Sequence, residues 1–515
     1  MSYPHLTLTP DILRYIVLFS SSAVVLTGSY INWRHRKAGT ALRAGGYAFL
    51  ASYPLIATLI FGPPASIRLA SYLMVFISSA IALLVSIYTS TYVKKYESNS
   101  LQMLIDAFAL SIVGVFIANY LLEFILFWLL AEAIGFFVVV YDALMGHGIR
   151  AWRAGLRYLA ISMIPADVGL MTLLAITGLH RSITVPLFSL GLNLSNNVIV
   201  TLITLGFMAK AAVAPLHFWL ADAHSIAPAP GSALLSGVMV KMGVYGLLIM
   251  PFIASHLSSI YWIELVVFGS ITTIYGGLQA LVQYDIKRIL AYSTISHTSE
   301  MSILIGLYVL SGSTVFFAAV MAYMIAHALY KSGLFMDSGF IEFHLHTRNI
   351  TRLGFVSRIA PLETLAALIA VMSLIGIPPT MGFLAKLVTL LALADKLVVS
   401  AVYIAALAVI IIGIILALGY GVRYLLVHLG SVEGLESVHV ERVEKGMSET
   451  VLAASSLGLV LPLGLSPIIV SKLSMPVLYL VLGITLILVL VILAALNDIL
   501  KKGRRHIPWL GGAMP

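Results

Sequence analysis

Residues 205–220, LGFMAKAAVAPLHFWL, place a lysine and a proline inside a stretch that is otherwise almost wholly apolar. Residues 373–387, SLIGIPPTMGFLAKL, repeat this combination, with two prolines ahead of the lysine. A proline inside a helix removes a backbone hydrogen bond and clashes with the preceding turn. At membrane depth, such irregular backbone is tolerated only where it is buried in protein or lines a water-filled cavity. The two stretches therefore predict two broken transmembrane helices, each with a lysine close to the break.

The overall composition indicates a membrane protein. Of 515 residues, 60% are hydrophobic and only 10% are charged, a balance typical of a polytopic membrane protein. We therefore predict an all-α membrane fold. The N-terminal residues lack the basic region and the cleavage site of a signal peptide, so we expect the first apolar segment to be retained.

The chain contains no cysteine. Disulfides, thiolate metal sites and cysteine-bound iron–sulfur clusters are therefore excluded. We expect no cofactor and no metal ion on this chain, and no redox chemistry carried out by it. Any redox group would have to lie on another chain.

About 20 apolar residues cross the hydrocarbon core, and this length predicts about fifteen transmembrane helices. The two breaks fall in the seventh and twelfth helices. Broken helices at corresponding positions of two halves point to inverted repeats, so we expect five-helix repeats in helices 4–8 and 9–13. A kink that serves only packing would leave the lysine at each break unexplained. The predicted spans are 12–31, 45–62, 70–92, 101–119, 121–142, 153–178, 197–222, 231–254, 260–282, 287–309, 312–337, 362–394, 399–427, 450–471 and 475–498.

These spans divide the chain into four expected segments. Residues 1–100 hold the first three helices, residues 101–254 the first repeat, and residues 260–428 the second repeat. Residues 429–515 hold the last helices and a basic tail that ends the sequence, with Lys501 and Arg505 in it.

Most of the 30 lysines and arginines fall on one side of this predicted bundle. The loops after odd-numbered helices carry them, for example Arg34, Lys94 and Arg150, whereas the opposite loops hold few. Cytoplasmic loops carry the excess of basic residues. We therefore expect a cell-membrane protein with its N-terminus outside and its C-terminus in the cytoplasm, and the net charge of +9 requires no nucleic-acid partner. This count assigns Arg36, Lys37, Arg43, Lys287 and Arg288 to loops of the basic side and Arg14 to the opposite side.

Four lysines and one glutamate lie deep inside the predicted spans. A charge near the bilayer centre costs about 3 kcal/mol on insertion scales, so each group needs a partner, water or a function. A lysine ammonium can release and regain a proton when its surroundings change. The pattern therefore favours a proton or ion path. The five residues are Glu132, Lys210, Lys241, Lys331 and Lys386.

The longest motif is the run of residues 210–246, KAAVAPLHFWLADAHSIAPAPGSALLSGVMVKMGVYG. DIKRILAYSTISH at 285–297, IAHALYKSGLF at 325–335 and GIPPTMGFLAK at 376–386 accompany it. Together they resemble the antiporter-like subunits shared by respiratory complex I, the multi-subunit cation/proton antiporters and the group 4 membrane-bound hydrogenases. The resemblance covers roughly residues 100 to 400.

The resemblance implies a set of residues for ion transfer. Glu132 corresponds to the glutamate of the fifth helix, although Ala131 precedes it where the family usually has tryptophan. We choose Glu132 over Glu123 because it lies deeper in the helix. The implied set is Glu132, Lys210, Lys241, His297, His327, Lys331 and Lys386.

Glu132 close to Lys210 would hold a proton on the lysine, and withdrawal of the glutamate would release it. A static buried salt bridge is the simpler alternative for this pair. Asp167 is another intramembrane acid. The sequence supports a functional role and a packing role for it equally well. His217 and His224 flank Asp222, but no HExxH-type spacing supports a metal there, and we expect a loop-facing role.

Three functions remain open. The first is an ion-translocating subunit, for protons or sodium, of a larger complex with other membrane subunits and a hydrophilic redox arm. The second is a stand-alone secondary transporter, and the third is a membrane scaffold without transport. A chain of protonatable residues with no set of groups for an organic substrate favours the first.

Overall fold

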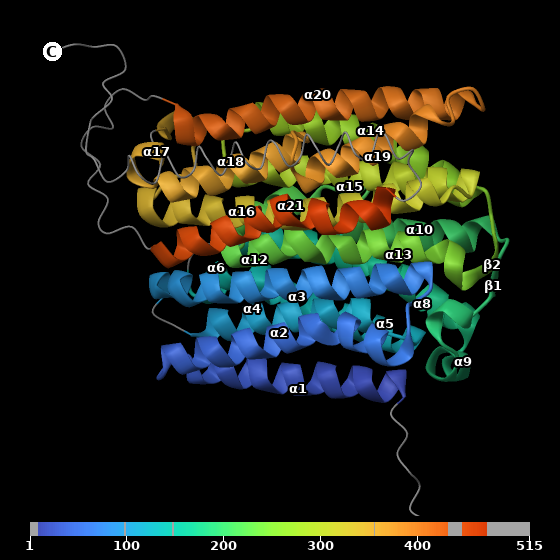
Figure 1. The fold of residues 1–515 in the computed structure, drawn as a ribbon, viewed down its shortest axis with the longest axis horizontal. Helices are drawn as coiled ribbons and strands as arrows, with labels where there is room; N and C mark the ends of the chain where they lie inside the picture. Colours follow the sequence, from blue (N-terminus) through green and yellow to red (C-terminus); the bar gives the residue numbers. More distant parts are fainter. Residues whose placement is uncertain (1–8, 97–98, 147–148, 355, 431–444, 471–515) are drawn as a thin grey trace, which may run out of the picture.

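The computed structural model describes residues 9–96, 99–146, 149–354, 356–430 and 445–470. These residues form a bundle of helices that run back and forth nearly parallel to one another (Figure 1). Ten of the helices are long and apolar enough to cross a membrane. The predicted all-α membrane fold is confirmed, and each predicted span before the last matches a helix or a group of consecutive helices. The span 475–498 and the basic tail lie outside the described residues.

The N-terminal part consists of long antiparallel helices along one edge of the bundle (Figure 1). Its elements are α1 (Pro10–Ile31), α2 (Arg36–Phe61), α3 (Ser66–Tyr92), the 3-10 helix η1 (Val93–Tyr96), α4 (Ser100–Ile117), α5 (Leu121–Val139) and α6 (Tyr141–Leu144).

The middle of the chain contains the first broken helix and two π-helical segments, η2 and η4. Its elements are α7 (Ile149–Arg157), η2 (Tyr158–Met163), α8 (Ile164–Thr177), α9 (Leu179–Thr184), η3 (Leu187–Ser189), β1 (Leu192–Leu194), α10 (Asn197–Ala211), α11 (Trp219–Ile226), α12 (Ala229–Leu234), η4 (Leu235–Met239), α13 (Val240–Ile253) and β2 (Ala254–Leu257).

The C-terminal part contains the second broken helix, formed by α18 and α19. Its elements are α14 (Ile260–Val282), α15 (Ile286–Ser311), α16 (Thr314–Leu345), η5 (Ile350–Arg352), α17 (Val356–Ile359), α18 (Pro361–Ile375), α19 (Met381–Ala394), α20 (Ala401–Leu429) and α21 (Lys445–Val470).

The two ends of the bundle differ. At one end, β1 and β2 pair in parallel beside α9 and join the loops before α10 and α14. At the other end lie α6 and α17 (Figure 1). These strands were not expected from the sequence, because three or four residues are too few for an alternating pattern to stand out.

Both predicted helix breaks are present. The first helix ends at Ala211, Ala212 adopts a left-handed conformation, and α11 starts at Trp219. The amide of Ala214, inside this break, donates to Thr272 Oγ1 at 2.9 Å. In the second broken helix, α18 ends at Ile375, Gly376 follows with a φ of 90°, and Thr380 caps α19. The Thr272 and Thr380 hydroxyl oxygens thus accept hydrogen bonds from backbone amides that have no helical partner at the breaks.

Three basic residues lie inside the bundle, and the loop assignments of two of them, Arg43 and Lys287, were wrong. Arg43 is buried within α2 with its Nη1 3.8 Å from Asp106 Oδ2. Arg14 is buried in α1 and pairs with Glu123 at 2.5 Å. Lys287, in the first turn of α15, is buried and pairs with Glu342 at 2.9 Å. Each finds a carboxylate on another helix, which a count along the sequence does not detect.

Arg43→Ala is expected to destabilise the bundle by about 3–5 kcal/mol, because it leaves the buried Asp106 carboxylate without its cation. Lys396→Ala is the matched control: Lys396 pairs with Asp395, which is 73% exposed, and exposed pairs contribute little. Thermal and denaturant unfolding of the detergent-purified chain measures both. Equal losses for the two variants would contradict a stabilising role for the buried pair.

Candidate functional site

Glu132 and Lys210 form an ion pair in the interior. Lys210 Nζ lies 2.6 Å from Glu132 Oε1, and both side chains are 0% exposed. Glu132 comes from the middle of α5, and Lys210 from the last turn of α10, just before the break. The ring of Tyr158 lies 4.9 Å from the ammonium, and Trp219, the first residue of α11, lies 5.9 Å from it. Aromatic faces attract a cation, so the site is shaped to hold an ammonium group.

Glu123, the other glutamate of α5, lies at the start of the helix and does not contact Lys210. It lies in the first turn of the helix, where it accepts hydrogen bonds from the amides of Asn119 and Tyr120 and pairs with Arg14. It therefore caps the helix. Of the two glutamates, Glu132 is the one that contacts Lys210, and its role in ion transfer stays a prediction.

Asp167 lies against the Glu132 carboxyl group. It stands in the first turn of α8, directly after the π-helical segment η2. Two acids and one lysine thus share this end of the site, and two carboxyl groups in contact can be accommodated only with a proton or a cation between them.

Lys241 lies at the centre of the bundle. Its Nζ donates to the carbonyl oxygen of Ser236 at 2.6 Å and contacts His327 Nδ1. Ser236 belongs to η4, where the helical hydrogen-bond ladder changes register. Gly237 allows α16 to approach here, because an added Cβ would lie 2.0 Å from Ser332 Oγ. The contact joins a helix of the first predicted repeat to one of the second.

His297 and His327 stand side by side with ring centroids 5.8 Å apart. His297 Nδ1 lies 3.0 Å from the Tyr323 hydroxyl and 3.4 Å from Glu300 Oε2, and the Tyr420 hydroxyl lies 2.9 Å from Nε2. Both ring nitrogens of this histidine therefore have partners that can donate or accept a proton.

Lys331 has no carboxylate partner among the described residues. Its Nζ donates to the carbonyl oxygen of Leu290 at 2.8 Å and to the Ser293 hydroxyl. His327 and Lys331 are four residues apart on α16, a spacing that places them on one helix face. The two side chains bind different partners, so the spacing alone does not link them.

Lys386 binds the end of the first half of its own broken helix. Its Nζ donates to the carbonyl oxygens of Leu374 at 2.9 Å and Ile375 at 2.8 Å. The last carbonyls of a helix lack intrahelical partners and carry partial negative charge. A Cβ on Gly376 would lie 2.6 Å from Lys386 Cδ, so glycine at this break also makes room for the lysine.

All seven residues of the predicted set are buried. The structure brings Glu132 together with Lys210, and Lys241 together with His327. In the described part of the chain, no direct hydrogen bond links Lys210 to Lys241, nor Lys331 to Lys386. Their assignment to one path stays a prediction.

Sequence reasoning missed several polar groups of this interior. Tyr158 and Tyr420 reach the site from distant helices, and no local pattern marks them. The loop-facing role expected for His224 is wrong, because its ring is buried and stacks on Phe335 with centroids 4.7 Å apart. Across the described ranges, no group of three or more His, Asp or Glu side chains is arranged to hold a metal ion.

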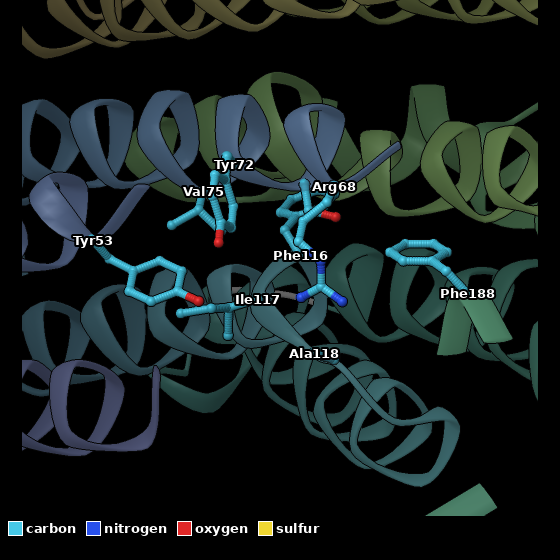
Figure 2. Close-up of a pocket in the computed structure, with 9 residues that line it drawn as sticks. Tyr53, Arg68, Tyr72, Val75, Phe116, Ile117, Ala118 and Phe188 are labelled. Atoms are coloured by element: carbon cyan, nitrogen blue, oxygen red, sulfur yellow. The ribbon is translucent and has the colours of Figure 1, made fainter. Parts of the chain in front are cut away.

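A pocket lies away from this row of residues. Residues of α3 and of the end of α4 line it, including Arg68, Tyr72 and Ile117 (Figure 2). Arg68 donates to Asn119 Oδ1 at 2.9 Å. The pocket contains none of the seven predicted residues.

A known protein family matches the part of the chain that holds the seven predicted residues. The family described as "NADH:quinone oxidoreductase/Mrp antiporter, TM" matches residues 118–414. The chain belongs to this antiporter family. The match includes all seven predicted residues, and it confirms the resemblance inferred from the motifs.

Individual relatives agree with this membership. Hydrogenase-4 component B of Escherichia coli (strain K12) is 29% identical over 332 residues, which are 61% of this chain and 49% of that protein. NADH-quinone oxidoreductase subunit M of Rickettsia conorii is 28% identical over 471 residues, 89% of this chain and 90% of that protein. The chain thus spans about half of the first relative and nearly all of the second.

A solved structure shares the fold of this antiporter-family chain. A chain in the Mrp complex from Dietzia sp. DQ12-45-1b superposes with a TM-score of 0.72, at 19% sequence identity, covering 92% of this chain and 99% of that chain. At this identity the likeness concerns the fold alone.

The buried pair provides a stability test of the site. Lys210→Met leaves two adjacent acids without a cation and is expected to cost about 3–5 kcal/mol. Glu132→Gln is expected to cost less, because Asp167 remains beside the lysine. The double variant should lose less than the sum of the two, with a coupling of about 0.5–3 kcal/mol. Denaturant unfolding in detergent measures this cycle, and strictly additive losses would mean that the pair does not interact.

Proposed function

We propose that this chain is the ion-translocating subunit of a larger membrane complex and moves protons, sodium ions or both. The observation that carries the proposal is the Glu132–Lys210 pair, fully buried at 2.6 Å. It stands in one interior with Lys241, His297 and His327. Membership of the antiporter family supports a role as one subunit among others, because the relatives described above are named as a component of hydrogenase-4 and a subunit of NADH-quinone oxidoreductase.

The pair acts as the gate in this proposal. At about 4 Å and an effective dielectric of 20, two unit charges attract by about 4 kcal/mol. Withdrawal of Glu132 from Lys210 removes this attraction and lets the lysine release its proton. Asp167, which touches Glu132, offers the glutamate a second position in which the two acids share a proton. The gate therefore has two arrangements built from groups already in contact.

The path then continues through the centre of the bundle. Lys241 and His327 are in contact, and His327 faces His297. We assign Lys331 to the path beyond the histidines and Lys386 to its end, where the ion leaves to one aqueous side. The repeats proposed for residues 101–254 and 260–428 each contribute one broken helix.

The remaining parts of the proposal concern the surroundings of the chain. The distribution of basic residues supports an N-terminus outside and a C-terminus in the cytoplasm. Redox groups such as iron–sulfur clusters, a flavin or a nickel–iron site would lie on partner subunits of a redox-driven complex. A scaffold without transport has no use for four buried lysines, each of which is costly to keep.

Lys210→Ala and Glu132→Ala are each expected to abolish or severely reduce ion pumping while the complex still assembles, because each removes one half of the gate. Proton and sodium fluxes into membrane vesicles measure the effect, normalised to the amount of assembled complex. Lys396→Ala, which alters a partly exposed lysine outside the predicted path, serves as the control with normal flux. Normal flux in either gate variant would rule out the gating role.

A further inference from the structure

A second group of buried ionisable residues lies outside the predicted path. Asp337 on α16, Glu363 in the first turn of α18 and His428 in the last turn of α20 are all fully buried. The Tyr424 hydroxyl donates to Asp337 Oδ2 at 2.6 Å, and His428 Nε2 lies 3.1 Å from the same oxygen. The group sits towards the end of the bundle that carries α6 and α17, where α18 begins and α20 ends (Figure 1).

The two acids of this group need a positive ligand. Glu363 lies against Asp337, with Ser448 of α21 beside it. In the described part of the chain, both oxygens of Glu363 and Oδ1 of Asp337 have no hydrogen-bond donor. Two carboxylates in contact cannot both be ionised in a dry site. Since no group arranged for a metal ion occurs among the described residues, a proton shared within this group, which includes His428 Nε2 at 3.1 Å from Asp337, fits this site.

One face of α16 leads from these acids towards the histidines. Asp337, Gly333 and Tyr330 follow one another at spacings of four and three residues, so they share a helix face. An added Cβ on Gly333 would meet only Ser455 Oγ closely, at 3.1 Å. The Ser455 and Tyr330 hydroxyls are buried and have no hydrogen-bond partner among the described residues. At Gly333 the face therefore packs closely against Ser455, and it is bordered by hydroxyl groups that can carry a proton.

Tyr330 completes the connection. Its ring centroid lies 5.2 Å from that of His327 and 5.9 Å from that of His297. Seven residues of helix rise about 10 Å, a distance that a few hydroxyl groups and bridging waters can span.

We propose that Asp337, Glu363 and His428 form a proton-loading site, which takes protons from the end of the bundle carrying α6 and α17 and passes them along Gly333, Ser455 and Tyr330 to the two histidines. This inference rests on the proposed function. The acid pair holds one proton between its oxygens. When a proton from water binds the ionised carboxylate, the first one leaves along the hydroxyl groups to a histidine nitrogen, and only O–H and N–H bonds form and break.

The competing interpretation is a clamp that fixes the ends of α18 and α20 without moving protons. Asp337→Asn and Glu363→Gln keep the shape of the side chains but remove the acids. These variants therefore distinguish the clamp from the loading site. A loading site predicts that proton flux per assembled complex falls about tenfold or more in each variant. A clamp predicts lower stability with unchanged flux. Glu264→Gln is the matched control, because Glu264 is a buried acid on α14 that binds Thr201 and should leave flux normal.

The experiment also includes the flux of a Gly333 variant and an infrared measurement. Every measurement uses membranes that hold the full complex. Gly333→Val should lower flux by displacing Ser455 from this face, while the infrared band of a protonated carboxyl group, absent from Glu363→Gln, should remain. Wild-type flux in all three variants, or no such band in the wild type, would overturn the loading site. If Lys210→Ala still loses flux, only this inference fails; if Lys210→Ala also pumps normally, the proposed function itself fails.

Discussion

Buried ammonium groups need electron-rich partners, and the irregular backbone of this bundle supplies many of them. Lys386 is held by the last carbonyl oxygens of α18, which are free because the helix breaks at Gly376. Lys241 is held by a carbonyl oxygen of the π-helical segment η4. A charge with no such partner is costly in a low-dielectric interior. The second helix break and the π-helical segment η4 are therefore what allows the bundle to keep Lys386 and Lys241 inside it.

The lysines divide into two kinds by their partners. Lys210 faces a carboxylate, whereas Lys241, Lys331 and Lys386 face carbonyl, hydroxyl or imidazole groups, which are uncharged. Loss of a proton from Lys210 leaves Glu132 without a cation. Loss of a proton from the other three leaves no carboxylate unpaired. The Glu132–Lys210 pair is thus the step most sensitive to charge, which is why the proposed function places control of ion flow there.

The sequence predicted the parts of the fold that depend on local pattern. The length of the apolar stretches predicted the helices. Prolines inside two apolar stretches that also carry a lysine predicted both breaks. The depth of Glu132 in its helix separated it from Glu123, which caps the same helix. Groups that depend on contacts between distant helices were not predictable in this way. Arg43 and Lys287 were assigned to loops because their carboxylate partners lie far away in the sequence, on α4 and α16.

The same limit applies to the acid group near Asp337. Glu363 and His428 stand at helix ends, where a polar residue is ordinary, and only the packing of α16, α18 and α20 makes them a buried cluster. Tyr158 likewise reaches Lys210 through a π-helical turn that no residue pattern marks.

The central claim is that ions cross along one buried row of residues that joins the two halves of the chain. Lys241 is the test position, because its contact with His327 links the two proposed repeats. The most direct measurement is proton flux in vesicles containing Lys241→Met, in which a thioether that cannot ionise replaces the ammonium group. The account predicts that flux is lost while the complex assembles and the Glu132–Lys210 pair stays intact. Wild-type flux in this variant would mean that ions cross without passing through the centre of the bundle.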